Sequence, residues 1–162
     1  MIFVTLGSQK FQFNRLLREI DRLVECGTIQ EEVFAQIGYS DYIPKNIKYK
    51  QFLDRDEFSE LMKKCEKVIT HGGTGAIIGA IKQKKKVIAV PRLEKFGEHV
   101  DDHQLQITKQ FKSMNFIETI DNIEELSHAI QKIEGSIYNR YVSNTSEIVN
   151  KIDDFIKDKM VN

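Results

Sequence analysis

The segment from His71 to Gly75 (HGGTG) constrains the fold more than any other part of the chain. It follows the short apolar run 67–70 (KVIT) and precedes the helix-forming residues 76–78 (AII). Glycines have no Cβ atom, so the backbone of such a turn can approach an anion closely, and the first N–H groups of the helix point at that anion. A strand that ends in glycines and continues into a helix therefore predicts a site for a nucleotide or another phosphorylated compound.

Other interpretations of this turn stay open or are excluded by the sequence. Glycines between a strand and a helix can form only a tight turn. No Gly-Lys-Ser/Thr follows, so the segment is not a P-loop and hydrolysis of ATP or GTP is not expected. Gly73-Thr74-Gly75 with Gly79 loosely resembles a nicotinamide dinucleotide fingerprint, but that motif normally lies in the first strand-helix turn. A nicotinamide-dependent oxidoreductase is therefore the weaker alternative.

Strand-like and helix-like segments alternate along the chain. Strands are predicted at residues 2–6, 33–37, 47–52, 67–70, 87–90 and 115–119. The strands 33–37 and 47–52 flank a turn that contains Gly38, Asp41 and Pro44, and amphipathic helices are predicted between the other strands and at residues 126–133. Asp121-Asn122-Ile123-Glu124 indicates a capping-box start for the last of these helices. This alternation predicts an α/β fold with a doubly wound, mostly parallel sheet and helices on both faces.

In such sheets ligands bind at the carboxyl ends of the strands, where the strand order reverses. If the first and fourth strands are neighbours, the turn Gly7-Ser8-Gln9 faces the segment 71–75 across that crevice. Ser8 and nearby backbone amides can then hold a phosphate from the second side.

A second polar segment follows Pro91 and runs from Arg92 to Gln104 (RLEKFGEHVDDHQ). It leads from a strand end into a helix and is expected on the same rim as the glycine turn. Asp102, His103 and Gln104 supply acceptors and donors of the kind that sugar hydroxyls need, and Arg92 can neutralise phosphate charge. Carbohydrate recognition is the favoured interpretation, and an exposed loop with a helix cap is the alternative. His99 and His103 make a metal site conceivable, but the spacing matches no established tetrahedral pattern, so none is predicted.

Length and charge indicate one domain without affinity for nucleic acid. The 162 residues suffice for one compact core, and 24 basic side chains balance 24 acidic ones. The run Lys84-Lys85-Lys86 is expected to be a solvated turn, with a membrane surface or an acidic partner as the alternative. Cys26 and Cys65 lack metal-ligand spacing and are expected to be reduced thiols in the core.

The chain ends in an amphipathic pattern and holds no predicted membrane span. From about Asn144 onward, apolar residues recur at helical spacing, which predicts a helix packed on the sheet or, alternatively, docked on a partner. No stretch of about 18 consecutive apolar residues and no basic leader is present, so a cytoplasmic location is expected.

The combination of three segments resembles a known family. These are Phe3-Val4-Thr5-Leu6-Gly7-Ser8, Thr70 to Gly75, and Val90-Pro91-Arg92 followed by residues 96–104 (FGEHVDDHQ). The chain is similar to the C-terminal, donor-binding half of family 28 glycosyltransferases. More narrowly, it resembles the small soluble subunit of bacterial two-subunit capsule and exopolysaccharide glycosyltransferases, which are related to the soluble subunit of the eukaryotic enzyme that adds the second N-acetylglucosamine to dolichol-linked sugar.

That resemblance implies a Rossmann-like C-terminal half of the GT-B type and a hexosyltransferase activity. A sugar, galactose by preference, would pass from a UDP-sugar to a lipid-linked saccharide at the inner face of the cell membrane, with no other cofactor and no metal. A membrane-anchored partner subunit would supply the acceptor-side domain and the catalytic base.

The resemblance also implies roles for individual residues. The donor diphosphate would contact Gly7, Ser8, His71, Gly72, Gly73, Thr74, Gly75 and Arg92. The donor sugar would lie near Glu98, His99, Asp102, His103 and Gln104.

The chain departs from the family pattern at one position. Relatives commonly carry a glutamate eight residues after the motif histidine, where it binds the ribose hydroxyls, and this chain has Gly79 there. Loss of a charge-assisted hydrogen bond weakens nucleotide binding by about 1.5–3 kcal/mol unless another group compensates. Two hypotheses follow, namely an active transferase with rearranged ribose contacts and a non-catalytic subunit that stimulates a partner.

Overall fold

The structure is a computed structural model that describes residues 1–144. These residues form one six-stranded sheet with five helices and two short 3-10 turns. In chain order the elements are β1 (Ile2–Thr5), α1 (Asn14–Glu25), β2 (Val33–Gln36), β3 (Lys48–Lys50), α2 (Arg55–Lys64), β4 (Lys67–His71), α3 (Thr74–Lys82), β5 (Lys86–Val90), η1 (Glu94–Phe96), α4 (His103–Ser113), β6 (Glu118–Thr119), η2 (Ile123–Glu125) and α5 (Leu126–Gly135).

The sheet has the strand order β3-β2-β1-β4-β5-β6, and every neighbouring pair is parallel. β1 lies at the centre, with Ile2 to Thr5 paired to Val33 to Gln36 on one side and to Lys67 to Thr70 on the other. The predicted doubly wound, Rossmann-like fold is confirmed, and so is the expectation that the first and fourth strands are neighbours. The crevice at the carboxyl ends of β1 and β4 is the topological switch point.

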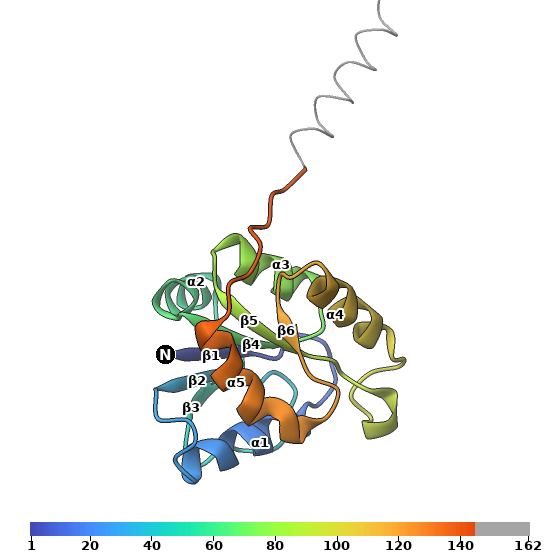
Figure 1. The fold of residues 1–162 in the computed structure, drawn as a ribbon. Helices are drawn as coiled ribbons and strands as arrows, with labels where there is room; N and C mark the ends of the chain where they lie inside the picture. Colours follow the sequence, from blue (N-terminus) through green and yellow to red (C-terminus); the bar gives the residue numbers. More distant parts are fainter. Residues whose placement is uncertain (145–162) are drawn as a thin grey trace, which may run out of the picture.

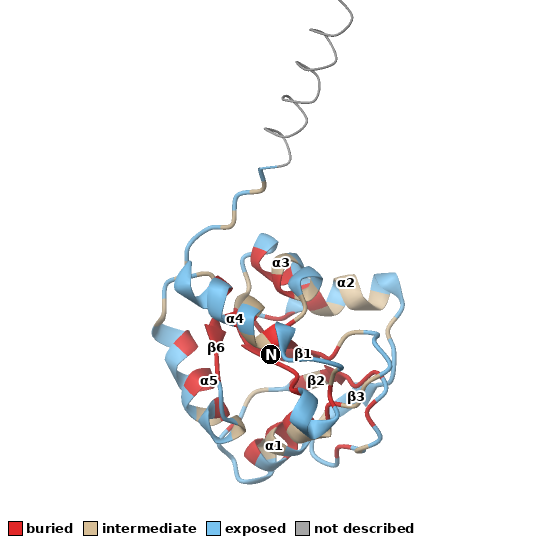
Figure 2. Ribbon diagram, turned by 90° about the vertical axis from the view of Figure 1, so that its right-hand side faces the viewer, coloured by how far each residue is buried: buried red, intermediate tan, exposed pale blue. Residues whose placement is uncertain are grey.

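Helices cover both faces of the sheet (Figure 1). The core beneath α1 and α5 contains Ile2 and Val4 of β1, while the core beneath α2, α3 and α4 contains Phe3 of the same strand. Alternate side chains of a strand point to opposite faces, so a strand covered on both sides needs a continuous apolar run. Figure 2 shows this burial pattern, with buried strands inside and exposed outer helix surfaces. The apolar run of β1 is thus the reason why it occupies the centre of the sheet.

The predicted boundaries at the sheet edges were less accurate. The strand expected at 47–52 is three residues long and exposed, and the one expected at 115–119 is reduced to Glu118 and Thr119. Edge strands have only one neighbour, so fewer backbone hydrogen bonds extend them.

The capping box predicted at Asp121 to Glu124 was wrong. Asn122 precedes the turn η2, where its side-chain amide donates to Glu125 Oε1 at 3.4 Å and no side chain caps the helix start. A capping box occurs instead at α2, where Asp54 Oδ1 accepts the Glu57 N–H at 2.8 Å. The backbone of Asn122 begins a 3-10 turn, so its side chain does not meet the N–H that a capping box would use.

Three expectations concern the cysteines, the membrane and the end of the chain. Cys65 is a buried thiol as predicted, but Cys26 is exposed because it follows the last residue of α1 at the helix end. Within residues 1–144, no helix combines the length and the apolar character that a membrane crossing requires. The helix predicted from about Asn144 lies outside the described residues apart from Asn144 itself.

Candidate functional site

The two turns expected to bind phosphate lie side by side at the carboxyl ends of β1 and β4. Gly7, Ser8 and Gln9 line one side of a hollow of about 430 Å³, and His71, Gly73, Gly75 and Ala76 line the other. They meet because β1 and β4 are paired in register up to Thr5 and Thr70. The predicted arrangement of these turns across a common crevice is confirmed.

The imidazole of His71 fills the space between the two turns. A Cβ atom on Gly7 would lie 2.7 Å from His71 Cε1, and a Cβ atom on Gly73 would lie 2.3 Å from His71 Nε2. Gly7 also has a φ of +73°, a backbone conformation that favours glycine. Both glycines are therefore required by the packed histidine as well as by any close approach of a ligand.

His71 is a neutral hydrogen-bonding group at neutral pH. Burial lowers its pKa from 6.5 to about 4, and the nearby charge of Arg92 contributes to the shift. Its Nδ1 lies 3.3 Å from the hydroxyl of Thr70, which itself donates to the Thr5 carbonyl at 2.9 Å. Because the Thr70 hydroxyl gives its hydrogen to Thr5, Nδ1 of the neutral imidazole is the donor to Thr70 and Nε2 is an acceptor. His71 in this arrangement therefore offers a phosphate neither a positive charge nor an N–H group.

The glycines of the 71–75 segment have three different roles. The N–H of Gly72 donates to Gln104 Oε1 at 3.0 Å, and a Cβ atom there would lie 2.7 Å from Gln104 Cβ. Gly72 therefore allows α4 to pack against β4. Gly73 makes room for His71 and precedes the first residue of α3, whereas a Cβ atom on Gly75 would meet nothing within 4 Å.

The first turn of α3 is the part of the site best suited to an anion. No side chain of the described residues caps this helix, and its first bond within the segment runs from Ile77 N to Gly73 O. The N–H groups of Thr74, Gly75 and Ala76 thus precede the first intrahelical donor and lie at the positive end of the helix dipole. Gly75 and Ala76 also line the hollow, so the geometry of this turn suits a phosphate group.

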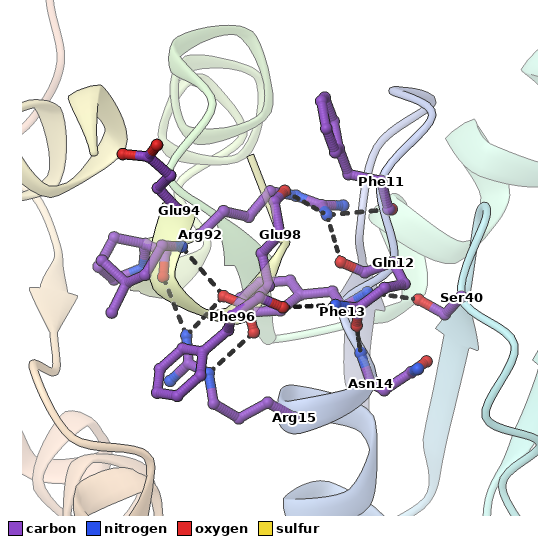
Figure 3. A network of polar contacts seen from close by, with 12 residues as sticks. Phe11, Gln12, Phe13, Asn14, Arg15, Ser40, Arg92, Glu94, Phe96 and Glu98 are labelled. Carbon is purple, nitrogen blue, oxygen red and sulfur yellow. Dashed lines mark hydrogen bonds and ion pairs between the residues drawn. The ribbon is translucent and has the colours of Figure 1, made fainter. Parts of the chain in front are cut away.

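The structure places Arg92 inside the protein and away from the role expected for it. Its side chain is 1% exposed, and its guanidinium donates to the carbonyls of Leu6, Phe11, Gln12 and Glu98 at distances of 2.6, 3.1, 2.9 and 3.3 Å (Figure 3). Burial lowers its pKa to about 10, so it remains charged at neutral pH. Arg92 therefore fixes the loop that follows β1, and it does not present its guanidinium to a phosphate.

Glu98 is likewise a structural residue in place of a sugar ligand. It is fully buried, and its carboxylate accepts from Arg15 Nε and Nη2, each at 2.9 Å, and from the Leu93 N–H at 3.0 Å (Figure 3). Arg15 belongs to α1, so this ion pair attaches the loop after β5 to the first helix. The carboxylate has its acceptor positions directed at these donors and is closed to solvent.

Gln104 connects the ends of two strands. Its Oε1 accepts the N–H of Gly72 at 3.0 Å and the N–H of Arg92 at 3.1 Å, and the residue is 5% exposed. Its side-chain oxygen is therefore occupied by the backbone at the ends of β4 and β5.

The other predicted sugar residues lie on the surface of the same rim. Asp102 and His103 are exposed and His99 is half-buried. Asp102 Oδ1 accepts the Glu94 N–H at 2.8 Å, and the ring of His99 lies against Phe11 with centroids 5.4 Å apart. These three side chains can reach a ligand at the carboxyl edge of the sheet.

Sequence reasoning missed residues that the tertiary fold adds to the site. Gln36 at the end of β2 lines the hollow, and its Nε2 lies 3.4 Å from the Gly7 carbonyl. Gly38 has a φ of +58°, and a Cβ atom there would lie 2.9 Å from Gly7 O. The doubly wound strand order that predicts β1 beside β4 also places β2 beside β1. This order was the signal from which Gln36 and Gly38 could have been assigned to the site.

Asp101 was also missed. Its Oδ1 accepts the N–H of His103 at 2.9 Å, and this backbone bond is the main reason that its pKa is lowered. An aspartate just before an apolar-periodic helix is a recognisable capping signal. Among residues 1–144, no three His, Cys, Asp or Glu side chains are grouped so that they could hold a metal ion.

The fold matches that of the C-terminal, Rossmann-like half of GT-B glycosyltransferases. Solved structures with this arrangement include the glycotransferase of kitacinnamycin (15% identity, TM-score 0.61, covering 83% of this chain and 35% of that one) and the calicheamicin glycosyltransferase CalG4 (15%, 0.61, 83% and 34%). MurG of Acinetobacter baumannii is similar at 15% identity and a TM-score of 0.56, with 83% of this chain and 41% of that chain covered. At such identities the likeness establishes the fold, and the chain spans between a third and two fifths of these proteins.

The sequence assigns the family. The glycosyltransferase family 28 C-terminal domain matches residues 1–158, and the chain belongs to this family. Among curated proteins, none matches the chain.

Proposed function

We propose that the chain is the donor-binding half of a UDP-sugar-dependent hexosyltransferase. The observation that carries this proposal is the hollow between the glycine turns, where the uncapped first turn of α3 faces Gly7 and Ser8. Membership of family 28 supports a nucleotide-sugar as the phosphorylated ligand. The donor sugar, galactose by preference, would extend from the diphosphate toward His99, Asp102 and His103 on the same rim.

The chemistry expected here is departure of UDP without a metal ion. Negative charge develops on the diphosphate as the bond to the anomeric carbon breaks. The N–H groups at the start of α3 and the hydroxyl of Ser8 are fixed donors that can stabilise this charge as it forms. Arg92 acts only indirectly, since its bonds to Leu6, Phe11 and Gln12 hold the loop that carries Ser8.

The acceptor side is proposed to come from another polypeptide. This proposal rests on the resemblance of the sequence to the small subunit of two-subunit glycosyltransferases. We infer a membrane-anchored partner subunit that supplies the catalytic base and brings a lipid-linked saccharide, in the synthesis of capsule or exopolysaccharide. The chain would then act at the inner face of the cell membrane.

A non-catalytic, partner-stimulating role is the second candidate, and Gly79 favours it. Glycine has no side chain with which to bind a ribose, although a Cβ atom at this position would meet nothing within 4 Å. A subunit without this anchor would bind a donor weakly. Family membership weighs against the third candidate, a nicotinamide-dependent oxidoreductase.

Calorimetric titration of the purified chain with UDP, UDP-galactose, UDP-glucose, UDP-N-acetylglucosamine and NADPH tests the proposal. Gly75→Asp is the sharpest variant because its side chain enters open space and an aspartate is favourable in the first turn of a helix. Its carboxylate would repel the diphosphate, and the matched neutral control is Gly75→Asn. We expect uridine-selective binding that weakens at least about tenfold in the aspartate variant and much less in the asparagine variant.

Other outcomes separate the candidates. Binding of NADPH alone would overturn the glycosyltransferase proposal. Silence toward every uridine ligand, followed by normal stimulation of the partner by Gly75→Asp, would establish the assisting role.

A further inference from the structure

A second hollow, larger than the one at the glycine turns, lies at the opposite end of the strands. This groove has a volume of about 600 Å³ and is formed by the end of α3, the turn into β5, Phe116 and residues 138–143. In Figure 1 the segment after α5 runs past the start of β5 toward the end of α3. Lys86 is the first residue of β5, so the groove lies at the amino ends of the strands and its occupant would not compete with a ligand at the glycine turns.

The groove is lined by cations and lacks acids. Lys82, Lys84, Lys85, Lys86 and Arg140 all line it, and no lining residue is acidic. The ammonium of Lys85 donates to the carbonyls of Lys63 and Cys65, and that of Lys86 donates to the Glu134 carbonyl. These carbonyl partners carry no net charge, and the acids Glu66 and Glu134 line an adjoining hollow and not the groove itself.

Aromatic rings form the apolar part of the groove. Phe116 and Tyr141 pack edge to face with centroids 5.8 Å apart, and Lys82 Nζ lies 5.8 Å from the centroid of Tyr141. Such a combination of cations and amphipathic aromatic rings suits a ligand that is anionic at one end and apolar at the other.

Lys84 provides an independent observation. α3 ends in a Schellman motif, in which Lys84 N donates to Ile81 O at 3.0 Å and Lys85 N donates to Ala80 O at 3.2 Å. The left-handed position of this motif, with a φ of +59°, holds Lys84, whereas glycine adopts that conformation without strain. A lysine at the left-handed position of this motif, where the backbone favours glycine, indicates that its side chain serves a purpose other than folding.

We propose that this groove binds the phosphate head group of an anionic membrane lipid. Among residues 1–144, no carboxylate lies within ion-pair distance of Lys82, Lys84 or Arg140, which leaves these three cations to hold the phosphate, while Phe116 and Tyr141 face its apolar part. The described chain ends at Asn144, beside the groove, and the sequence that follows carries apolar residues at helical spacing. Peripheral proteins generally need two weak membrane signals, and the groove would supply one of them. An acidic protein segment, by contrast, would leave the aromatic part of the groove without a role.

Binding of the full-length chain to sucrose-loaded phosphatidylcholine vesicles, with and without phosphatidylglycerol, tests the proposal. Lys84→Gly is the decisive variant because it removes one cation and also relieves the left-handed backbone. We expect its binding to phosphatidylglycerol vesicles to fall about fivefold, since one basic residue near an anionic surface contributes about that factor. Its thermal stability should be equal to or higher than that of the wild type, which a merely structural role for Lys84 would not produce.

The controls separate the groove from general electrostatics and from other ligands. Lys109→Ala on α4 makes the same change in net charge away from the groove and should leave vesicle binding unchanged. The triple variant Lys82→Ala, Lys84→Gly, Arg140→Ala should lose about a hundredfold. Equal losses in Lys109→Ala and Lys84→Gly, unaltered binding in the triple variant, or groove-dependent binding to polyglutamate without binding to vesicles would each overturn the proposal. None of these readouts depends on glycosyl transfer.

Discussion

The glycine turns after β1 and β4 and the polar loop after β5 lie at the same edge of the sheet but use their polar groups in opposite ways. The first region keeps the N–H groups of Thr74, Gly75 and Ala76 at an open hollow. In the second, Arg92, Glu98 and Gln104 direct their side chains at the protein's own backbone and at Arg15. A dense run of donors and acceptors can therefore stabilise its own loop, while a turn with few side chains remains available for a ligand.

The largest expected effect tests whether the second region is structural. Arg92→Met removes the donors of four carbonyls and leaves buried acceptors unpaired, so we expect the free energy of unfolding to fall by about 3–5 kcal/mol. Urea denaturation measures this loss, and Lys95→Met on the exposed surface of the same loop is the control. If Arg92→Met kept nearly wild-type stability and lost only UDP binding, Arg92 would be a ligand contact and not a structural residue.

Gly79→Glu tests whether the glycine turns form a nucleotide site. Residue 79 is one helical turn beyond Gly75, which lines the hollow, and its added side chain would meet open space. A carboxylate there can accept from the ribose hydroxyls, so we expect UDP affinity to rise roughly tenfold to a hundredfold, measured by calorimetry. Gly79→Ala should stabilise α3 by about 1 kcal/mol without changing the affinity. Unchanged or weaker UDP binding by the glutamate variant would place the ribose elsewhere.

The pH dependence of stability tests whether His71 is buried and neutral. Its pKa is about 4 in the folded protein and 6.5 in the unfolded chain, so below pH 6.5 the unfolded state binds a proton that the folded state does not. Stability is therefore lost as the pH falls from 6.5 toward 4, by about 2 kcal/mol at pH 5. Urea denaturation of the wild type and His71→Gln at pH 7 and pH 5 isolates this contribution from that of the carboxylates. Equal losses in both proteins would show that His71 is accessible to water.

The smallest expected effect is a difference in stability between alanine substitutions at Gly73 and at Gly75. Gly75→Ala places a methyl group in open space and should raise the free energy of unfolding by about 0.5–1 kcal/mol. Gly73→Ala should lower it, because its Cβ atom would lie 2.3 Å from His71 Nε2. Thermal denaturation distinguishes the two signs, and a destabilising Gly75→Ala would mean that this part of the hollow is closed.

Much of the fold was predictable because it depends on local patterns. The apolar runs of β1, β4 and β5, the glycine turns and the alternation of strands with helices are each visible within a few residues. Pairing of β1 with β4 followed from the usual doubly wound order. The short edge strand β6 and the start of α5 were predicted less well, since their extent depends on neighbours in the sheet and on a 3-10 turn.

The candidate site was likewise predictable where it depends on contiguous residues and unpredictable where it depends on distant ones. The sequence alone located the strand, glycine turn and helix start that form the candidate anion site, because these are contiguous between Lys67 and Lys82. Only the tertiary structure decided that Arg92 and Glu98 are internal, because their partners Leu6 and Arg15 are 86 and 83 residues away. A side chain's chemistry is fixed by its residue type, but its exposure depends on which distant carbonyls and charges the folded chain brings within hydrogen-bonding distance.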